Sequence, residues 1–506
     1  MVKKILSGLA IATLLTATIN GESLWTDEAF SAFVASHRTL AACWSTLVAG
    51  DSSDLQMVLY YLYLHVWSQV FGQSEIAMRS ANIPFIILYS GILVWASYRL
   101  FSSGWVWAVA ALAPLAVSFA SEIRPYFDIM ALSLTCVTCL LVYLRGPTDR
   151  ERVVLPWLVL LSLLFGATFH MLMLLLVPPL FVLILVFCLS DREAIRWQDW
   201  KRPMLVLSPA IAGLIVYFGW TFGRGATYDY AKPDLISMGS VLFRFIGLSG
   251  YAPNRHYDIP FRPYMAAMAI STAAFGMGLA ALLLVQSKSR EKVCFRALFI
   301  SLGVAIIQIY VLGIVVKQQI EFRHTSSLLP LLLLLMMAGL SGTSSRSIAI
   351  VAAALFSATW LISDLRLELS PDYRREDFRA AVRQTLQLQK GSNAAISVVA
   401  DPVACAYYGL DMQGPKPCFP LTDSCTQGFS KVPWQKETVA QYALPWTPTE
   451  ISTWLRNQSR NKLPVVLMIS RSRHPSIKES AWWPAIQKQS NVSVYPEHGF
   501  FIYLLK

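Results

Sequence analysis

Long apolar runs constrain this chain more than any other feature of its sequence. Ten of them approach the length of a membrane span, and one more follows Lys3 and Lys4 near the N-terminus. They cover residues 5–19, 82–100, 105–120, 126–144, 154–169, 171–189, 205–222, 264–286, 297–316, 326–341 and 348–363. Only 14% of the 506 residues are charged, against about 25% in soluble domains. The sequence therefore predicts an all-α polytopic membrane domain with about eleven transmembrane helices.

The N-terminal segment admits two readings. Two lysines before an apolar run resemble a secretory signal peptide. The residues after the run, Thr18 to Glu22, offer no clean site of small residues for cleavage, which favours an uncleaved first span. Either reading places the following residues outside the cytoplasm.

Residues 55–71 form an amphipathic stretch that could be a span or a helix lying in the membrane interface. They contain His65 and a run of tyrosines, which favours the interface. If the stretch is not a span, the basic loops at 145–151, 191–202 and 288–296 all fall inside, as the positive-inside rule requires. If it is a span, they all fall outside. The loop charges therefore predict a cytoplasmic N-terminus and juxtamembrane helices within a long first external loop, about 21–81. They also account for the net charge of +12 without a nucleic-acid partner.

The chain changes character after about residue 364. It becomes polar and rich in Pro, Asn, Gln and Ser, with short β-like runs at 395–399, 465–469 and 500–504 and helical stretches at about 374–389 and 448–457. We predict two domains: a transmembrane domain over 1–365 and a small α/β extracytoplasmic domain over 366–506.

The cysteines follow this division. Cys136, Cys139 and Cys188 lie in apolar runs and Cys294 lies in an inside loop, as packing residues do. Cys405, Cys418 and Cys425 are expected outside, where one disulfide among the three can form. A bridge between Cys418 and Cys425 would close a short loop, but the pairing stays open.

Ionisable residues from distant parts of the chain gather at the external face. An ionisable residue near a membrane span is costly, so such a cluster is a functional hypothesis by default. Its members are Asp27 and Glu28 after the first span, Glu122 and Arg124 at the end of another, His170 between two spans, and Arg323 and His324 at the start of a later one.

Such a cluster suits a transferase with a lipid-linked donor. The phosphate leaving group needs cationic neutralisation, for which Arg124, Arg323 and His324 are candidates. The acceptor hydroxyl needs a carboxylate base, for which Asp27 is the candidate. Glu28 or Glu122 would orient the acceptor, and Asp27 and Glu122 would be the ligands of any divalent ion such as Mg, Mn or Zn. The sequence identifies no cofactor with certainty.

Each residue alone also has a structural reading. Asp27 and Glu28 could be acids at a helix start, Glu122 and Arg124 an interfacial ion pair, and His170 a packed or capping histidine. Arg323 and His324 could be residues snorkelling at a span end, and Arg79 could anchor a span in the same way. Their agreement on one face favours the joint functional reading.

At these residues the sequence resembles the fold-C glycosyltransferases, in the bacterial branch related to protein O-mannosyltransferases and to the aminoarabinose transferase that modifies lipid A. The resemblance covers about residues 1–365. It is carried by Asp27-Glu28-Ala29, Asp54-x-Gln56-Met57-x-Leu59-Tyr60-Tyr61, Phe71-Gly72-x-Ser74-Glu75-x-x-x-Arg79, Ser121-Glu122-x-Arg124-Pro125-Tyr126, His170 and Phe322-Arg323-His324. Many relatives have Pro-Pro where Met57-Val58 stands here, which puts the shape of the substrate groove in doubt.

The resemblance implies inverting sugar transfer from a polyprenyl-phosphate donor to a lipid, glycan or protein acceptor on the extracytoplasmic side of a bacterial inner membrane. It implies Asp27 as the base and Arg79 as a further donor-phosphate residue. It also implies a substrate-binding set of Asp54, Gln56, Tyr60, Tyr61, Tyr126 and His170. Two rival readings are a transporter or lipid flippase, for which the sequence offers no internal repeat, and a noncatalytic envelope assembly protein, which would not need Asp27 or Glu122.

Overall fold

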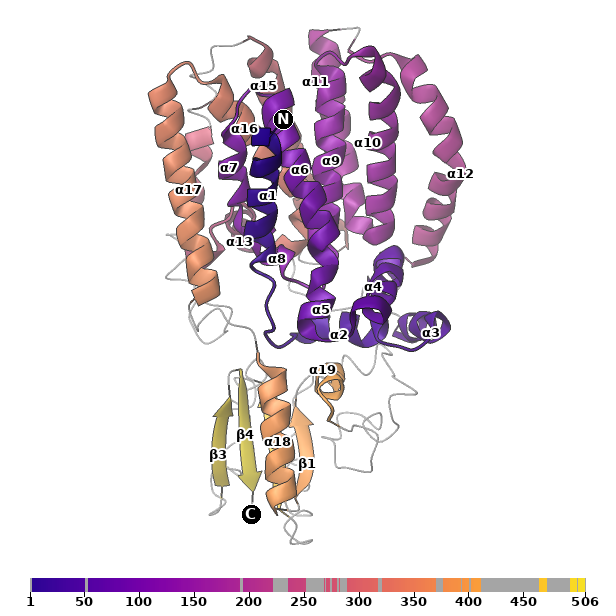
Figure 1. Ribbon diagram of the computed structural model, residues 1–506, viewed down its shortest axis with the longest axis vertical. Coiled ribbons are helices and arrows are strands. Elements are labelled where there is room, and N and C mark those ends of the chain that lie inside the picture. The colour runs from indigo at the N-terminus through magenta and orange to yellow at the C-terminus, as the bar shows by residue number, and fades with distance from the viewer. Residues whose placement is uncertain are drawn as a thin grey trace.

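The computed structural model shows a helical bundle with a small sheet domain below it (Figure 1). It describes the chain with gaps. The described residues are 2–50, 53–191, 194–221, 235–251, parts of 268–282, 289–316, 321–369, 376–392, 394–399, 402–410, 464–470, 492–497 and 499–505.

The long apolar runs form the helices of the bundle. Among the described residues, eight helical segments are long and apolar enough to cross a membrane. They span Glu75–Arg99, Tyr126–Leu144, Asp149–Phe169, Met171–Ser190, Trp197–Thr221, Lys292–Val315, Phe322–Gly342 and Arg346–Leu369. The corresponding helices are α6 (Ile83–Arg99), α9 (Tyr126–Leu144), α10 (Asp149–Phe169), α11 (Val177–Ser190), α12 (Trp197–Thr221), α15 (Ser289–Val316), α16 (Leu329–Gly342) and α17 (Arg346–Leu369). The predicted polytopic helical fold is confirmed.

Three of the eleven predicted spans differ from this set. The first is α1 (Val2–Thr16), a helix of 15 residues. The run at 105–120 is two short helices, α7 (Val106–Ala111) and α8 (Pro114–Ala120), because Ala113 is extended and Pro114, which has no N–H, opens the second helix. The run at 264–286 lies mainly outside the described residues.

Helices α9 and α16 form the centre of the bundle. Every residue of α9 is buried within the protein, and so is every residue of α16 except Ser341. α9 packs against α6 and α10, and α16 packs against α15 and α7. Apolar residues predominate on every side of both helices, as is usual for helices enclosed by others.

Short helices lie across the lower end of the bundle (Figure 1). They are α2 (Thr26–Ala35), α3 (Leu40–Gly50), the 3-10 helix η1 (Ser53–Met57), α4 (Val58–Phe71) and α5 (Glu75–Arg79). The stretch 55–71 is therefore η1 and α4, and α4 is not among the segments able to span a membrane. These helices are the juxtamembrane elements expected of the first external loop.

The C-terminal part combines helices with a four-stranded sheet in the order β1-β2-β4-β3. Its elements are α18 (Phe378–Ser392), β1 (Ala395–Val399), α19 (Pro402–Tyr407), β2 (Val465–Ser470), β3 (Val492–Glu497) and β4 (Phe500–Leu505). β1 and β2 are parallel, and β4 runs antiparallel to β2 and β3. Three strands match the predicted β-like runs, and α18 matches the predicted helix at 374–389. The helix predicted at 448–457 lies outside the described residues.

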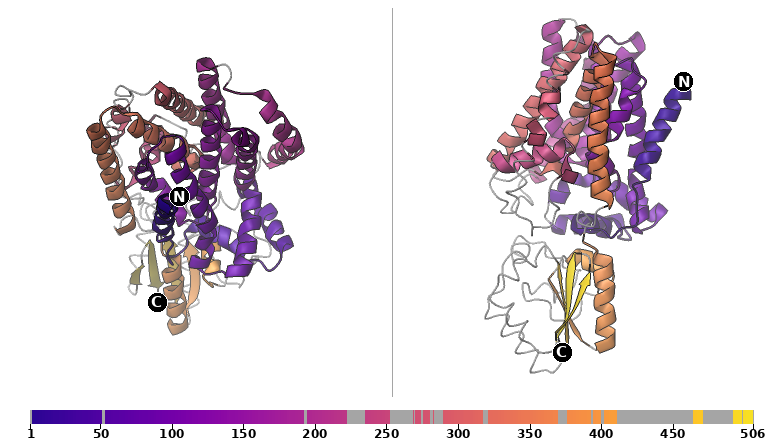
Figure 2. Two further views of the ribbon diagram at one scale, coloured as in Figure 1. Left: turned by 45° about the horizontal axis from the view of Figure 1, so that its top comes forward. Right: turned by 90° about the vertical axis from the view of Figure 1, so that its left-hand side faces the viewer.

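The boundary between the two predicted domains falls inside a helix, because α17 continues to Leu369. Figure 2 shows α17 running down one side of the bundle and the sheet below it. The division at 365/366 stays a prediction.

Candidate active site

The predicted residues come from elements that meet where the bundle faces the C-terminal domain. α2 carries Asp27 and Glu28, and η1 and α4 carry Asp54 and Tyr61. The segment between α8 and α9 carries Glu122 and Arg124, and His170 follows α10. The 3-10 helix η5 (Phe322–Leu328) carries Arg323 and His324 and packs against α9.

Adjacent acids on α2 have opposite environments. The Glu28 side chain has no exposed surface, whereas 29% of the Asp27 side chain is exposed. Successive helical residues point about 100° apart, so one acid can enter the protein while the next stays accessible. Asp27 is therefore the acid of this pair that a substrate can reach.

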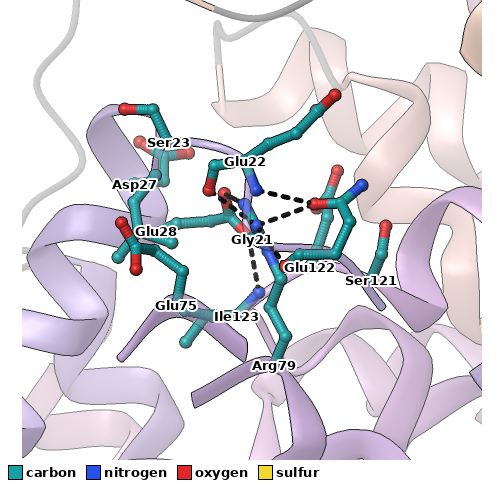
Figure 3. A network of polar contacts seen from close by, with 12 residues as sticks. Gly21, Glu22, Ser23, Asp27, Glu28, Glu75, Arg79, Ser121, Glu122 and Ile123 are labelled. Carbon is teal, nitrogen blue, oxygen red and sulfur yellow. Dashed lines mark hydrogen bonds and ion pairs between the residues drawn. The ribbon is translucent and has the colours of Figure 1, made fainter. Parts of the chain in front are cut away.

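Glu28 is held in a buried network with Arg79. Arg79 Nη2 lies 2.9 Å from Glu28 Oε2, and Arg79 Nε donates to Oε1 at 3.3 Å. The Ile123 N–H also donates to Glu28 Oε1, at 2.9 Å. Figure 3 shows Glu28 directed toward Arg79 and Ile123. Glu28 and Arg79 are thus each other's partners in this structure, and the catalytic role of Glu28 and the phosphate-binding role of Arg79 stay predictions.

Asp27 is paired with Arg323 instead. Arg323 Nη1 lies 2.5 Å from Asp27 Oδ2, and Arg323 Nε lies 2.7 Å from Glu321 Oε2. The guanidinium also stands over the Trp25 ring, 5.5 Å from its centroid. Arg323 on η5 and Asp27 on α2 therefore form an ion pair, although they are 296 residues apart in sequence.

A second arginine–acid pair lies beside the first. Arg124 Nη1 lies 2.8 Å from Asp54 Oδ1 and donates to Ser31 Oγ at 3.1 Å. The Tyr61 hydroxyl donates to Asp54 Oδ1 at 2.7 Å. Burial, with Asp54 adding to it, raises the pKa of Tyr61 well above its ordinary value, so the hydroxyl keeps its proton. The Nε of Arg124 has no hydrogen-bond acceptor among the described residues.

His170 lies near these arginines as a neutral imidazole. Burial lowers its pKa well below 6.5, and His324, Arg124 and Arg323 lower it further. The Leu172 N–H donates to His170 Nδ1 at 3.2 Å, so the proton sits on Nε2. The Tyr126 ring lies 6.1 Å from the His170 ring. His324 has its Nδ1 occupied by the Glu321 N–H, at 3.1 Å.

The contacts of three further predicted residues do not assign them a role. Glu122 is buried beside this network, and its backbone carbonyl accepts from Asn82 Nδ2 at 2.9 Å. Tyr60 is buried with its ring 5.6 Å from that of Tyr61. Gln56 is half-buried in η1. Their substrate-binding and catalytic roles stay predictions.

Four residues of this region were not predicted. Asn82 donates to the carbonyls of Phe119, Ala120 and Glu122 and so holds the end of α8. Glu321 pairs with Arg323, and the Arg244 guanidinium lies 5.1 Å from the centroid of the Phe322 ring.

The fourth is Asp128, in the first turn of α9. It is fully buried, and neither carboxylate oxygen has a hydrogen-bond partner among the described residues. An acid inside a predicted span was a signal that could have identified it.

The residues of the predicted metal site are described in the structure, whereas those of the predicted disulfide are described only in part. Within the described part of the chain, no three His, Cys, Asp or Glu side chains are grouped as metal ligands. One oxygen of Asp27 is occupied by Arg323, so a metal bound by Asp27 and Glu122 stays a prediction. Cys405 is buried. Cys418 and Cys425 lie outside the described residues.

The arrangement combines an accessible carboxylate, two arginines and a neutral histidine N–H within one site. Guanidinium groups bind phosphate through paired N–H donors. A carboxylate beside them can accept a proton. The site can therefore bind a phosphorylated substrate and remove a proton from a second one.

Comparisons with known proteins agree with the fold. No protein-family profile matches the chain, and no curated protein matches it. Its structure is similar to that of ArnT from Cupriavidus metallidurans bound to undecaprenyl phosphate, with a TM-score of 0.50 and 14% identity. The apo crystal structure of the same protein gives a TM-score of 0.51, also at 14% identity. Both matches cover 99% of this chain and 98% of the other. The chain therefore has the fold-C glycosyltransferase-like fold that its sequence motifs predicted.

Proposed function

We propose that this protein is a membrane glycosyltransferase that moves a sugar from a polyprenyl-phosphate donor to an acceptor hydroxyl. The observation that carries the proposal is the pairing of the accessible Asp27 carboxylate with Arg323, next to Arg124 and its own acid Asp54. The bound undecaprenyl phosphate in the ArnT structure supports the class of donor. The acceptor is a lipid, a glycan or a protein.

The arginines have a direct electrostatic role in this reaction. A sugar ester of polyprenyl phosphate carries one negative charge, and the phosphate that leaves carries two. Negative charge therefore grows on the leaving oxygen as the bond to the sugar breaks. Arg124 and Arg323 stabilise this growing charge more than they stabilise the bound donor, which is the condition for lowering the barrier. The Nε2–H of His170 adds a neutral hydrogen-bond donor.

Asp27 serves as the base. The acceptor oxygen attacks the anomeric carbon, the carbon–phosphate oxygen bond breaks, and the hydroxyl proton passes to the Asp27 carboxylate. A single displacement of this kind inverts the anomeric carbon. Because Glu28 is sealed from solvent by Arg79, its part is to fix α2 so that Asp27 faces the substrates.

The Asp27–Arg323 pair also makes Asp27 available to the acceptor only after the donor has bound. In the structure, Arg323 is shared between Asp27 and Glu321. A donor phosphate, like a carboxylate, can accept two parallel N–H bonds from a guanidinium, so a bound donor competes with Asp27 and Glu321 for Arg323. As Arg323 turns to the phosphate, the oxygen of Asp27 that it occupied becomes available for the acceptor hydroxyl.

The substitution Asp27→Asn tests the proposal. It keeps the shape of the side chain and removes the base, so transfer from radiolabelled undecaprenyl-phosphate sugars in membranes should fall by about 100-fold or more. Glu22→Gln is the matched control, because Glu22 is an exposed acid on the same loop, and it should transfer at the wild-type rate.

Either of two results would contradict the proposal. One is an Asp27→Asn variant that transfers as fast as the wild type. The other is a wild-type protein in vesicles that moves the labelled donor across the bilayer without consuming it, which is the behaviour of a flippase.

A further inference from the structure

The C-terminal domain contacts the first external loop directly beside the site. α19 packs against α2, and α18 begins next to the segment that joins α1 to α2 (Figure 1). Within this contact the Tyr407 hydroxyl donates to the Gln73 carbonyl at 2.6 Å. The Leu24 N–H donates to the Tyr408 hydroxyl, also at 2.6 Å. The two parts of the chain are therefore joined by directional polar bonds as well as by packing.

Arg379, in the first turn of α18, makes most of this connection. Its Nη1 lies 3.0 Å from Glu75 Oε1, and its Nη2 donates to the Gly21 carbonyl at 2.9 Å. Its backbone N–H donates to Ser23 Oγ at 3.2 Å. One residue of the C-terminal domain thus holds α5 and the segment 20–24 together.

The same segment is held from its other side by Arg79. Arg79 Nη1 donates to the carbonyls of Asn20 and Glu22, at 3.0 and 2.8 Å. In an extended chain successive carbonyls point in opposite directions. The Asn20 and Glu22 carbonyls therefore reach one arginine while the Gly21 carbonyl, between them, reaches the other. Figure 3 shows Gly21 and Glu22 beside the Arg79 guanidinium, with Glu75 and Ser23 nearby.

Further contacts connect the segment 20–24 to Asp27, the proposed base. Arg79 binds Glu28 by two of its nitrogens, and Glu28 is the neighbour of Asp27 on α2. The segment 20–24 also leads directly into α2, which begins at Thr26. A shift of this segment would therefore move Asp27 relative to Arg323, which belongs to a different element.

We propose that Arg379 is a positioning residue: through it the C-terminal domain clamps the segment 20–24 and so sets the place of Asp27 in the site. This rests on the proposed function for its catalytic consequence, but the clamp itself can be measured without activity. A displacement of about 1 Å in a reacting group can lower a rate by about 100-fold, so a clamp on the support of the base affects turnover more than substrate binding.

The test compares Arg379→Gln and Tyr408→Phe with a control, Arg383→Gln. Arg379→Gln removes the ion pair and the paired donor, Tyr408→Phe removes the acceptor of the Leu24 N–H, and Arg383 is an exposed arginine one turn along the same helix. We expect kcat to fall about tenfold in the first two variants, with KM for the donor within about twofold of wild type. Arg379→Lys should restore part of kcat, because a lysine still donates to one acceptor.

Hydrogen exchange in detergent micelles supplies the readout that needs no activity. Peptides covering residues 20–28 should exchange faster in Arg379→Gln and Tyr408→Phe than in wild type or Arg383→Gln. Wild-type exchange in Arg379→Gln overturns the clamp, whatever Tyr408→Phe does, and faster exchange in Arg379→Gln with wild-type kcat overturns the positioning role. If wild-type protein transfers no sugar, or Asp27→Asn transfers normally, the proposed function fails and the exchange data alone decide the clamp.

Discussion

At the scale of single residues, the site separates roles that are adjacent in sequence. Asp27 and Glu28 are both acids in the first turn of α2, yet one is accessible and the other is sealed against Arg79. The sequence predicted that both belong to the site. It could not say which would face inward, because the deciding partner, Arg79, lies 51 residues away.

His170 predicts a pH dependence of stability. Burial lowers its pKa in the folded protein below 6.5, while the unfolded chain keeps the ordinary value. As the pH falls below about 6.5, His170 binds a proton in the unfolded state but not in the folded state. The free energy of unfolding therefore falls by up to about 1.4 kcal/mol per pH unit. His170→Asn keeps an acceptor for the Leu172 N–H and removes the titrating group.

Thermal unfolding in detergent between pH 7.5 and 5.5 measures this effect. The melting temperature of wild type should fall more steeply toward low pH than that of His170→Asn. Equal slopes for the two proteins would mean that the imidazole titrates normally in the folded state.

At the scale of elements, the joint between α8 and α9 depends on one amide. Asn82 is 2% exposed and donates to three carbonyls at the end of α8. This joint carries Glu122 and Arg124, so the amide of Asn82 supports two of the site's charged residues from a different helix. Nothing in the apolar run that begins at residue 82 indicated this role, since an Asn at a helix start is common.

Asn82→Ala tests the joint. It removes the side-chain donor of three carbonyls, of which only that of Phe119 also accepts from the Glu122 N–H, and this loss should lower the free energy of unfolding by about 1–3 kcal/mol. It should also slow sugar transfer by letting Arg124 move. Ser80→Ala, two residues earlier, is the control: Ser80 Oγ donates to the Ala77 carbonyl in its own turn, and Trp67 Nε1, which donates to Ser80 Oγ, keeps the Ala77 carbonyl as an acceptor. If Asn82→Ala is as stable and as active as Ser80→Ala, Asn82 does not support the joint between α8 and α9.

The elements themselves were predicted unevenly. Uninterrupted runs such as 126–144 became helices with the expected bounds, because an apolar stretch of span length has few other structures. The run at 105–120 broke at Pro114, and β3 was missed. β3 is an edge strand that contains Pro496, and edge strands tolerate proline because one side needs no ladder bond.

At the scale of the molecule, the site lies at the end of the bundle nearest the C-terminal domain. The N-terminus lies toward the other end (Figure 1). That other end also holds the Arg99–Glu151 ion pair at 2.8 Å. Loop charges predict that this end is cytoplasmic, and we propose that the site and the C-terminal domain face the periplasm or its equivalent.

Reporter fusions test this orientation. Alkaline phosphatase, which folds only outside the cytoplasm, should be active when fused after Lys506 and inactive when fused after Gly146, in the loop between α9 and α10. A green fluorescent protein that folds only in the cytoplasm should give the reverse pattern at both positions. Activity of the phosphatase at Gly146 would place the basic loops outside and contradict the positive-inside assignment.

The contrast between α9 and α12 bears on how the sequence can change over time. Every residue of α9 is enclosed by protein, whereas α12 buries only Trp200, Pro203, Phe218 and Thr221. A substitution in α12 that stays apolar exchanges one lipid contact for another. In α9 it must fit neighbours that are already packed, and the cost rises with each methylene added or removed. Diverging copies of this protein should therefore keep α9 nearly unchanged while α12 drifts among apolar residues.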